Sequence, residues 1–542
     1  MSRRKPAKSP VQAATRPPVK SRSTGARAFN RRAQVARRQA ARKQAARSRR
    51  VRAPSFHPQE LLGKIPRGAL ICALVACLNA ICWSIITPPF QAPDEPSHFA
   101  YTQELATTER LPISAPSNYS AEESAVLSDL HHLEVRWHPE VHAISSATEQ
   151  QRLDRDLNRG LSPRGEGKVG VASAQPPLYY ALEVIPYGLG LAGSLLDQLE
   201  LMRLLSAMMG ALTALFIFMF VREALPRLPW AWTVGGLSIA LAPALGFMSG
   251  VVNPDSMLFA VSAAIFYCLA RAFRRGLTRR LAIVIGVLTA VGFLTKVNFI
   301  GLAPGVILGL IVLTVRASRI YDRHTALRSL ALALAVALSP ACLYVLINLL
   351  SGHPGLGIVS AGIAGTRVRG SLLNELSYIW QFYLPRLPGM PGHYFPGLLT
   401  TRLWFDRSVG LYGWLDTSFP MWVNNLAVVP AGLIAVLCAR ALLAGRVMLR
   451  ERLGELIVYA VAGLGLMILI GADSYQALGS EGASYVEPRY LLPMLPILAL
   501  ALALAARGAG RRWGPVVGSS IVVLFLAHDI FSQLLVVSRF YG

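Results

Sequence analysis

Apolar positions dominate the chain in long runs, and this pattern predicts a bundle of membrane-spanning helices. A helix that crosses a bilayer needs about 20 mostly apolar residues, and runs of this kind recur between residues 68 and 536. We predict eleven spans, near residues 68–87, 200–221, 230–250, 255–273, 281–295, 299–315, 329–350, 424–444, 456–471, 490–506 and 515–536. The pattern therefore predicts an all-α polytopic membrane domain over residues 66–540.

One further apolar run, residues 176–196, does not read as a simple span. Its sequence, PPLYYALEVIPYGLGLAGSLL, opens with two prolines and contains Glu183 and Pro186. Prolines and an internal acid disfavour a straight helix in hydrocarbon. The run is either a twelfth span or a helix at the membrane interface, and the basic residues distinguish the two.

The basic residues fix the topology because cytoplasmic connections of membrane proteins are rich in Lys and Arg. Residues 1–65 hold 19 Lys and Arg and a single acid, so we expect a disordered basic tail in the cytoplasm. If 176–196 does not span, every Arg-rich connection also falls in the cytoplasm, namely 271–280, 316–328, 439–455 and 506–514. We therefore predict a juxtamembrane or re-entrant helix at 176–196 and two large extracytoplasmic loops, 88–199 and 351–423.

Composition and charge agree with a membrane protein and narrow the partners. Of the 542 residues, 53% are hydrophobic and only 15% are charged, whereas soluble domains are nearer a quarter charged. Most of the net charge of +25 lies in the tail, which suits anionic membrane lipids; nucleic acid is the less favoured partner. All six cysteines lie in apolar runs, so we expect neither a disulfide framework nor a cysteine metal site.

On this topology, polar residues collect at the extracytoplasmic ends of the helices. Asp94, Glu95 and His98 follow the first span in PPFQAPDEPSHFAY. The others come from later helix ends, and they are Gln175, Arg203, Asn253, Asp255, Lys296, Asn298, Arg489 and Tyr490. Charged groups at membrane depth usually mark functional pathways. Carboxylates can hold a divalent cation, and Lys and Arg can bind phosphate oxygens, so these residue types suit a metal-bound phosphate. A carboxylate could also act as a general base.

Each of these residues also has a purely structural interpretation. PDEPSH and NPDS could cap helices, and Arg203, Lys296 and Arg489 could be interfacial anchors. The histidines of HHLEVRWHPEVHA fit no tight zinc spacing, which favours a solvated loop face; they are His131, His132, His138 and His142. The functional interpretation is favoured over the structural one because the short motifs all fall on one side of the membrane.

An ordered set of motifs resembles the GT-C glycosyltransferase superfamily, and most of all an uncharacterised bacterial branch of it. The set comprises PDEPSH, QPPLYY, RLLSAMMGALT, NPDS, LTK and PRYLLPMLP, and it covers roughly residues 68–510. Two positions depart from the superfamily pattern. Gln175 stands where many relatives have His or Lys, and Pro488 stands where a Gly often precedes the Arg-Tyr pair.

The resemblance implies a GT-C-like fold and a transfer reaction on the extracytoplasmic face of the cell membrane. The donor would be a sugar on a polyprenyl phosphate or pyrophosphate, and the acceptor an envelope glycan, lipid or protein. Asp94 matches the superfamily's first-loop acid and would be general base or metal ligand for Mg²⁺ or Mn²⁺, with Glu95 in support. The remaining positions would bind substrate and phosphate, namely His98, Gln175, Arg203, Asn253, Asp255, Lys296, Arg489 and Tyr490.

Two other functions remain compatible with the sequence. A transporter or flippase of lipid-linked precursors would also need many helices and buried charge, although we find no repeated segment and the polar groups lie at helix ends. A non-catalytic envelope assembly protein could retain the same fold.

Overall fold

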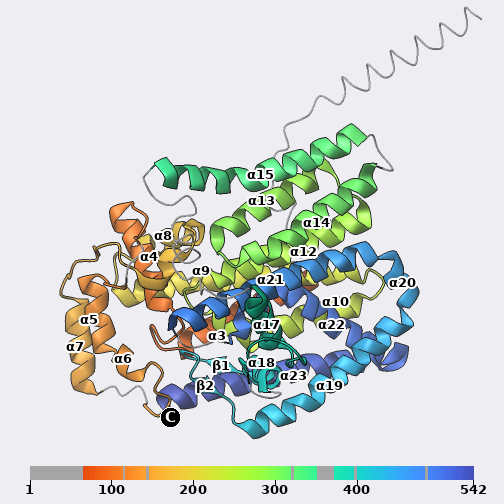
Figure 1. Cartoon of the computed structure of the whole chain (residues 1–542). Coiled ribbons are helices and arrows are strands. Elements are labelled where there is room, and N and C mark those ends of the chain that lie inside the picture. Colours follow the sequence, from red (N-terminus) through yellow and green to blue (C-terminus); the bar gives the residue numbers. More distant parts are fainter. Residues whose placement is uncertain are drawn as a thin grey trace, which may run out of the picture. The chain divides into compact units, whose positions relative to one another are not determined.

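The structure, a computed structural model, describes residues 65–542 apart from 114–115, 142–145, 319–322, 351–371, 396–398 and 482–485. The expected basic tail and part of the second large loop lie outside the described residues. The all-α polytopic architecture is confirmed, with a two-stranded hairpin as the only sheet in the described part of the chain (Figure 1).

Nine helices in the described ranges are long and apolar enough to cross a membrane. They are α3 (Arg67–Ile86), α9 (Leu195–Ala224), α12 (Asp255–Arg275), α14 (Phe299–Ser318), α15 (Arg323–Leu350), α19 (Met421–Ala444), α21 (Leu453–Glu481), η2 with α22 (Pro488–Met494 and Leu495–Gly508) and α23 (Gly510–Tyr541). A tenth candidate is the pair α10 (Pro229–Ala240) and α11 (Pro243–Ser249), bent by 54°. The eleventh expected span is α13 (Arg279–Thr295), whose 17 residues are at the lower limit of spanning length.

The remaining elements are short and flank these helices. They are α4 (Glu95–Thr108), α5 (Ala121–Asp129), α6 (His132–Val135), α7 (Ala147–Leu157), η1 (Gly170–Ala174), α8 (Leu178–Leu189), α17 (Leu372–Tyr383), α18 (Leu399–Val409), β1 (Leu411–Tyr412), β2 (Thr417–Ser418) and α20 (Arg446–Glu451). Helix α8 has 12 residues, about 18 Å of helix, which is too short to cross a bilayer. Within 176–196, α8 therefore falls short of spanning length, as expected for this run.

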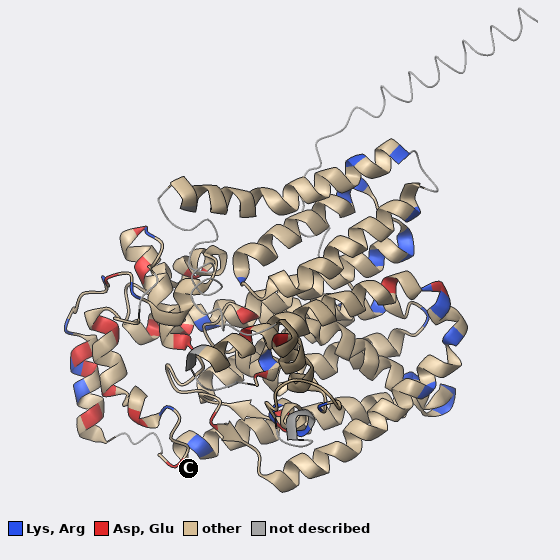
Figure 2. Ribbon diagram, in the orientation of Figure 1, with Lys and Arg blue, Asp and Glu red and all other residues tan. Residues whose placement is uncertain are grey.

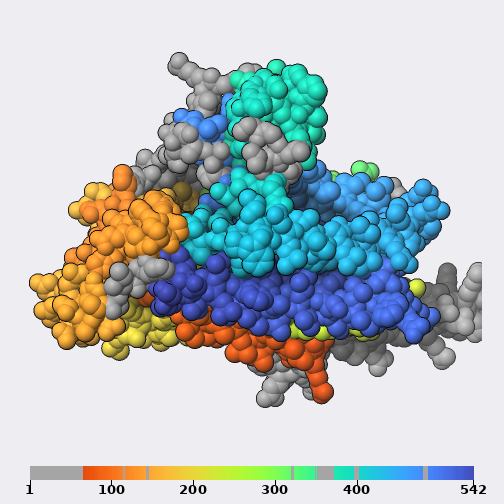
Figure 3. Space-filling view, turned by 90° about the horizontal axis from the view of Figure 1, so that it is seen from below, coloured from red at the N-terminus to blue at the C-terminus, as the bar shows by residue number. Residues whose placement is uncertain are grey.

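Helix α12 lies at the centre of the bundle. Its spanning window is 83% buried, and it packs mainly on α9, with α13 and α14 also in contact. The windows of α19 and α15 are only 6% and 11% buried. Figure 3 shows α23 as a band across one face with α19 beside it. The exposed leucines and valines of these outer helices therefore suit contact with lipid.

Small residues bring α11 close to α3, and this contact positions the site. A Cβ on Gly246 would lie 2.4 Å from the ring of Trp83, and one on Gly250 would lie 2.6 Å from the carbonyl oxygen of Ala80. Trp83 also donates from its ring nitrogen to Asp529 Oδ1 of α23 at 3.0 Å. The end of α3 is thus fixed between α11 and α23, directly before the residues that carry the candidate chemistry.

Charges separate along the bundle. In Figure 2, Lys and Arg gather where α14, α20 and their neighbours end, while many acids lie on α5 and α7 and near α4. Since α9 and α12 each run the length of the bundle, the polar site near Asp255 and the Arg-rich end near Arg275 lie at opposite ends of α12.

Candidate active site

The loop between α3 and α4 is short and has an unusual backbone. Helix α3 ends at Ile86 because Pro88 and Pro89 follow, and proline cannot continue a helix. Phe90 and Asp94 have φ angles of 63° and 64°, in the left-handed region that non-glycine residues rarely adopt. Such conformations cost on the order of 1–3 kcal/mol each and persist only where surrounding contacts impose them.

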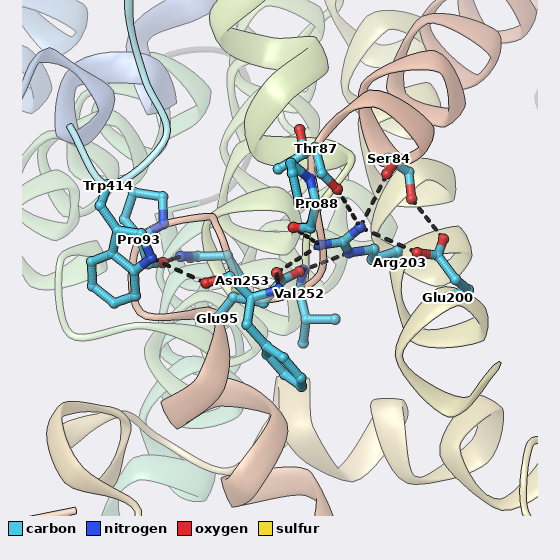
Figure 4. Close-up of polar contacts among 11 residues, drawn as sticks. Ser84, Thr87, Pro88, Pro93, Glu95, Glu200, Arg203, Val252, Asn253 and Trp414 are labelled. Atoms are coloured by element: carbon cyan, nitrogen blue, oxygen red, sulfur yellow. Dashed lines mark hydrogen bonds and ion pairs between the residues drawn. The ribbon is translucent and has the colours of Figure 1, made fainter. Parts of the chain in front are cut away.

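Those contacts come from a buried ion pair between Glu95 and Arg203. The Glu95 carboxylate accepts from the backbone nitrogens of Phe90 and Val252, each at 3.0 Å, and from Arg203 Nε and Nη2 at 2.8 and 2.7 Å (Figure 4). Both side chains are fully buried. Arg203 Nη1 and Nη2 also donate to backbone oxygens of the α3 end, those of Ser84, Thr87 and Pro88. The pair therefore fixes the loop against α9 and the α11–α12 connection.

This geometry corrects the expected roles of Glu95 and Arg203. Glu95 was expected as a catalytic acid and metal ligand, but its two oxygens are already taken by four internal donors and have no access to solvent. Arg203 was expected to bind substrate, but its guanidinium is directed at the protein backbone and Glu95. Both side chains fix the backbone of the loop that carries Asp94.

Asp94 is the acid that remains accessible. It occupies the position before α4, yet its side chain forms no capping hydrogen bond, so the capping interpretation fails. Its Oδ2 accepts from Arg489 Nη2 at 3.1 Å, and about 30% of the side chain is exposed. Burial disfavours the charged form, but the nearby cations Arg489 and Lys296 lower the pKa of Asp94 below its usual value. Asp94 is therefore a carboxylate at neutral pH.

Arg489 connects Asp94 to a second group of residues. Its Nε donates to Glu487 Oε2 at 2.7 Å, and its Nη2 donates to the hydroxyl of Tyr490 at 3.2 Å. Its Nη1 is buried and has no hydrogen-bond partner among the described residues. The Lys296 ammonium lies 5.3 Å from the centroid of the Tyr490 ring, so both cations flank this tyrosine.

Asn253 and Asp255 hold the opposite side of the site. Asp255 Oδ1 lies 2.8 Å from Lys296 Nζ, while its Oδ2 is buried and accepts no hydrogen bond from the residues described. The Asn253 oxygen accepts from the Asp255 backbone nitrogen at 3.0 Å, and its amide donates to the carbonyl of Pro93 at 3.5 Å. NPDS thus forms a local turn before α12 and also contacts the residue before Asp94.

His98 and Gln175 complete the set. His98 Nδ1 lies 2.9 Å from the hydroxyl of Tyr180. Burial, with Lys296 and Arg489 nearby, lowers the pKa of His98 to about 3 in spite of Asp94, so the imidazole is neutral. Gln175 accepts from the backbone nitrogen of Val297 at 3.3 Å, next to Lys296.

Eight of the ten expected residues therefore lie around one site, and Glu95 and Arg203 lie behind it. With Glu487, three acids pair with the two bases Lys296 and Arg489. No group of three or more His, Cys, Asp or Glu within the described ranges could hold a metal ion. Of the four loop histidines, His142 lies outside the described residues, His131 pairs with Glu134 and Glu149, and His132 packs on Trp414.

An apolar cavity of about 340 Å³ begins beside Glu487 and Arg489. It lies between α11, the β1–β2 hairpin, η2 with α22, and α23. Most of its wall is aliphatic or aromatic, including Phe247, Met248, Leu411, Tyr412, Leu491, Leu492, Met494, Leu495, Leu498 and Phe525. The cavity can therefore take a hydrocarbon chain whose polar end meets Arg489.

Sequence reasoning missed two residues of the site. Glu487 was available as the acid two positions before Arg489, in VEPRY. Tyr180 was available in QPPLYY, where only Gln175 drew attention. Both lie within or next to motifs already identified in the sequence, so their place beside these motifs could have identified them as site residues.

Fold and site together define a polytopic helical membrane protein with a polar, charge-paired site at the end of an apolar cavity. A family model described as "Predicted membrane protein (DUF2142)" matches residues 77–498. The chain belongs to this family. No curated protein matches it.

Solved structures of two proteins are similar to the chain at low identity. ArnT from Cupriavidus metallidurans bound to undecaprenyl phosphate has 14% identity and a TM-score of 0.46, over 83% of this chain and 63% of that one. The same protein in the apo state has 13% identity and a TM-score of 0.42, over 80% and 59%. The oligosaccharyltransferase of Archaeoglobus fulgidus, tethered with an acceptor peptide, has 14% identity and a TM-score of 0.42, over 88% and 55%. The chain thus spans less than two thirds of the length of these proteins.

Proposed function

We propose that the protein is a membrane glycosyltransferase that moves a sugar from a polyprenyl-phosphate-linked donor to a cell-envelope acceptor. The observation that carries the proposal is Asp94, a partly exposed carboxylate paired with Arg489 beside an apolar cavity. The reaction would take place on the extracytoplasmic face of the cell membrane, because the Arg-rich connections lie at the other end of the bundle.

The cavity and its cations suit the donor. The polyprenyl chain would occupy the apolar cavity, and its phosphate would lie near Arg489 and Lys296. Arg489 Nη1 is buried without a partner among the described residues, and a phosphate oxygen would supply the missing acceptor. Since a phosphate competes with Asp94 for Arg489, donor binding would raise the pKa of Asp94 and make it a stronger base.

Asp94 would act on the acceptor. Its carboxylate takes the proton of the acceptor hydroxyl while that oxygen bonds to the anomeric carbon of the sugar. The bond between the anomeric carbon and the phosphate oxygen breaks, and the phosphate leaves with the electron pair. Arg489 and Lys296 balance the charge that develops on the phosphate.

A divalent cation also fits the site. Mg²⁺ is commonly bound by one or two carboxylates together with substrate phosphates, so three protein ligands are not needed. Asp94 Oδ1 accepts no hydrogen bond from the residues described, which leaves it available to a cation. As the alternative to its role as general base, Asp94 would hold Mg²⁺ or Mn²⁺, and the cation would neutralise the phosphate.

The test is transfer of labelled sugar by the purified full-length chain from a panel of polyprenyl-phosphate sugars, with and without divalent cation. Asp94→Asn retains the size of the side chain and tolerates the left-handed backbone, but removes charge and basicity. We expect the transfer rate to fall on the order of 10²–10⁴-fold with an unchanged unfolding midpoint.

Asp154→Asn is the matched control, because Asp154 is an exposed acid on α7 away from the site. It should transfer like the native chain. Full transfer by Asp94→Asn would refute the catalytic assignment. Movement of intact donor across vesicles without any transfer would instead support the transporter alternative.

A further inference from the structure

A second large cavity lies at the end of the bundle opposite to the candidate active site. It has a volume of about 800 Å³ and lies between the ends of α9, α12, α14, α20, α21 and α22. Along α12, about 28 Å separates Asp255 at the active site from Arg274 at this cavity. The two sites are therefore separate.

Arginine is the most frequent residue of the cavity wall, and we name it the arginine-lined cavity. Its arginines are Arg227, Arg274, Arg316, Arg452 and Arg507, and its acids are Glu223, Glu451 and Glu455. The lining therefore has an excess of two positive charges. Figure 2 shows Lys and Arg gathered at this end of the bundle.

Two of these arginines are fixed in place by buried acids. Glu223 Oε2 lies 2.8 Å from Arg274 Nη1, and Glu455 Oε2 lies 2.8 Å from Arg452 Nε. Arg452 Nη1 also donates to the carbonyl of Ala224 at 2.7 Å, which joins α21 to α9. These bonds give the cavity a defined wall.

Three arginines of the wall are not paired with an acid among the described residues. Within the described ranges, the side chains of Arg227, Arg316 and Arg507 form no hydrogen bond or ion pair with the protein. The Arg316 guanidinium lies 5.1 Å from the centroid of Phe273, a contact that leaves its N–H groups free to donate. Arg316 and Arg507 are half-buried, so they would gain most from an anionic partner.

The arginine-lined cavity continues into an apolar cleft. The cleft, of about 70 Å³, lies between α19, α21 and α22 and shares Met448, Arg452 and Arg507 with the larger cavity. Its other walls are mostly aliphatic, with Ala441, Leu442, Leu449, Leu456, Leu500 and Leu504. Interfacial arginines that only anchor helices do not require a hollow with an apolar extension.

We propose that the arginine-lined cavity binds the headgroup of an anionic phospholipid. The phosphate lies among Arg227, Arg316 and Arg507, and one hydrocarbon chain enters the apolar cleft. Charge alone would also suit a soluble phosphate, but the cleft fits an amphiphile. The site is independent of sugar transfer and needs no assumption about the donor.

The test measures binding of short-chain phosphatidylglycerol to the purified full chain in neutral detergent, with phosphatidylcholine and glycerol phosphate as comparison ligands. We expect phosphatidylglycerol to bind and the two comparison ligands to bind at least tenfold more weakly. Equal binding of glycerol phosphate would overturn the lipid assignment in favour of a soluble phosphate. Equal binding of phosphatidylcholine would overturn the role of charge.

The variant that tests the arginines is Arg227→Gln/Arg316→Gln/Arg507→Gln. Each arginine near an anionic lipid contributes about fivefold in affinity, so the triple variant should weaken binding on the order of a hundredfold. The matched control is Arg279→Gln/Arg280→Gln/Arg511→Gln, which removes three exposed arginines from the same end but not from the cavity. An equal loss of phosphatidylglycerol affinity in the control would show that general surface charge causes the effect. That result would overturn the proposed lipid site.

A second variant keeps the proposal testable if the triple variant does not fold. Leu504→Phe fills part of the apolar cleft without changing charge. It should weaken long-chain phosphatidylglycerol severalfold and leave a two-carbon-chain analogue unchanged. Unchanged binding of both lipids would contradict entry of a chain into the cleft.

Discussion

Substitution of either neighbouring acid should reduce transfer, at Asp94 through lost catalysis and at Glu95 through lost stability. Glu95→Gln tests this difference most directly. The substitution keeps the shape of the side chain but replaces one carboxylate oxygen by an NH₂ group. That group would face the donors of Phe90, Val252 or Arg203, all within 3.0 Å of the native carboxylate. It would also leave the Arg203 guanidinium buried without its full counter-charge.

The magnitude follows from this geometry. Removing one partner of a buried ion pair costs about 3–5 kcal/mol. Native proteins have a free energy of unfolding of about 5–15 kcal/mol, so the loss is a large fraction of the total. We expect a clear fall in the unfolding midpoint in detergent and faster proteolysis of the loop before α4. Transfer activity should fall in proportion to the remaining folded protein.

The assay is a thermal unfolding curve recorded beside the transfer rate per folded molecule, with Asp94→Asn as the comparison. Replacing both members of the pair, as in Glu95→Leu with Arg203→Met, should destabilise less than the single change because no unpaired charge remains. A native midpoint with abolished transfer in Glu95→Gln would refute the positioning role and restore Glu95 as a group that touches substrate.

Further predictions concern pH, packing and topology. Burial, with Glu122 nearby, raises the pKa of Glu123 on α5 well above its usual value. The free energy of unfolding should therefore fall as the pH rises above the pKa that Glu123 has in the unfolded chain. Thermal melts at several pH values should show this fall for the native chain and not for Glu123→Gln. Because the pKa of Asp94 is lowered in the free protein, the acid limb of kcat/KM for transfer should lie below about pH 4, the usual Asp pKa; a limb of kcat/KM near pH 6 would contradict this. Gly250→Ala should destabilise by about 1–3 kcal/mol because its Cβ would overlap Ala80, whereas Gly432→Ala on α19 has open space and should not, as unfolding curves can show. In a chain without native cysteines, an impermeant thiol reagent should label Asp154→Cys from outside and not Arg279→Cys; the reverse would invert the topology.

The sequence predicts most helix positions but not their interruptions. The first span was expected at 68–87 and is found at Arg67–Ile86, because a long apolar run between prolines leaves little choice. The expected span 230–250 is instead two helices bent by 54° before Pro243, and 490–506 begins as a 3₁₀ segment over Pro488–Met494. Prolines in both segments were the available signal. Ser194 extends α9 toward its N-terminus by a side-chain cap that hydropathy does not detect.

The site was predictable as a set of residues but not as a set of pairs. Topology alone brought Asp94, Asp255, Lys296 and Arg489 to one side of the membrane. It did not distinguish Asp94 from Glu95, since adjacent acids in one loop look equivalent until their directions are known. The buried role of Glu95 depends on Arg203, and the open role of Asp94 on a left-handed backbone that no local propensity indicates.

The pairing of Asp94 with Arg489 also has a consequence for biosynthesis. The two residues are 395 positions apart in the chain. At a ribosomal rate of about 5–20 residues per second, Asp94 is synthesised on the order of 20–80 s before Arg489. Glu95 meets Arg203 after only 108 positions, so the loop can take its shape while most of the helices are still unmade. A nascent or truncated chain would thus carry a shaped but incomplete site, and competence for chemistry would arrive only with the last helices inserted.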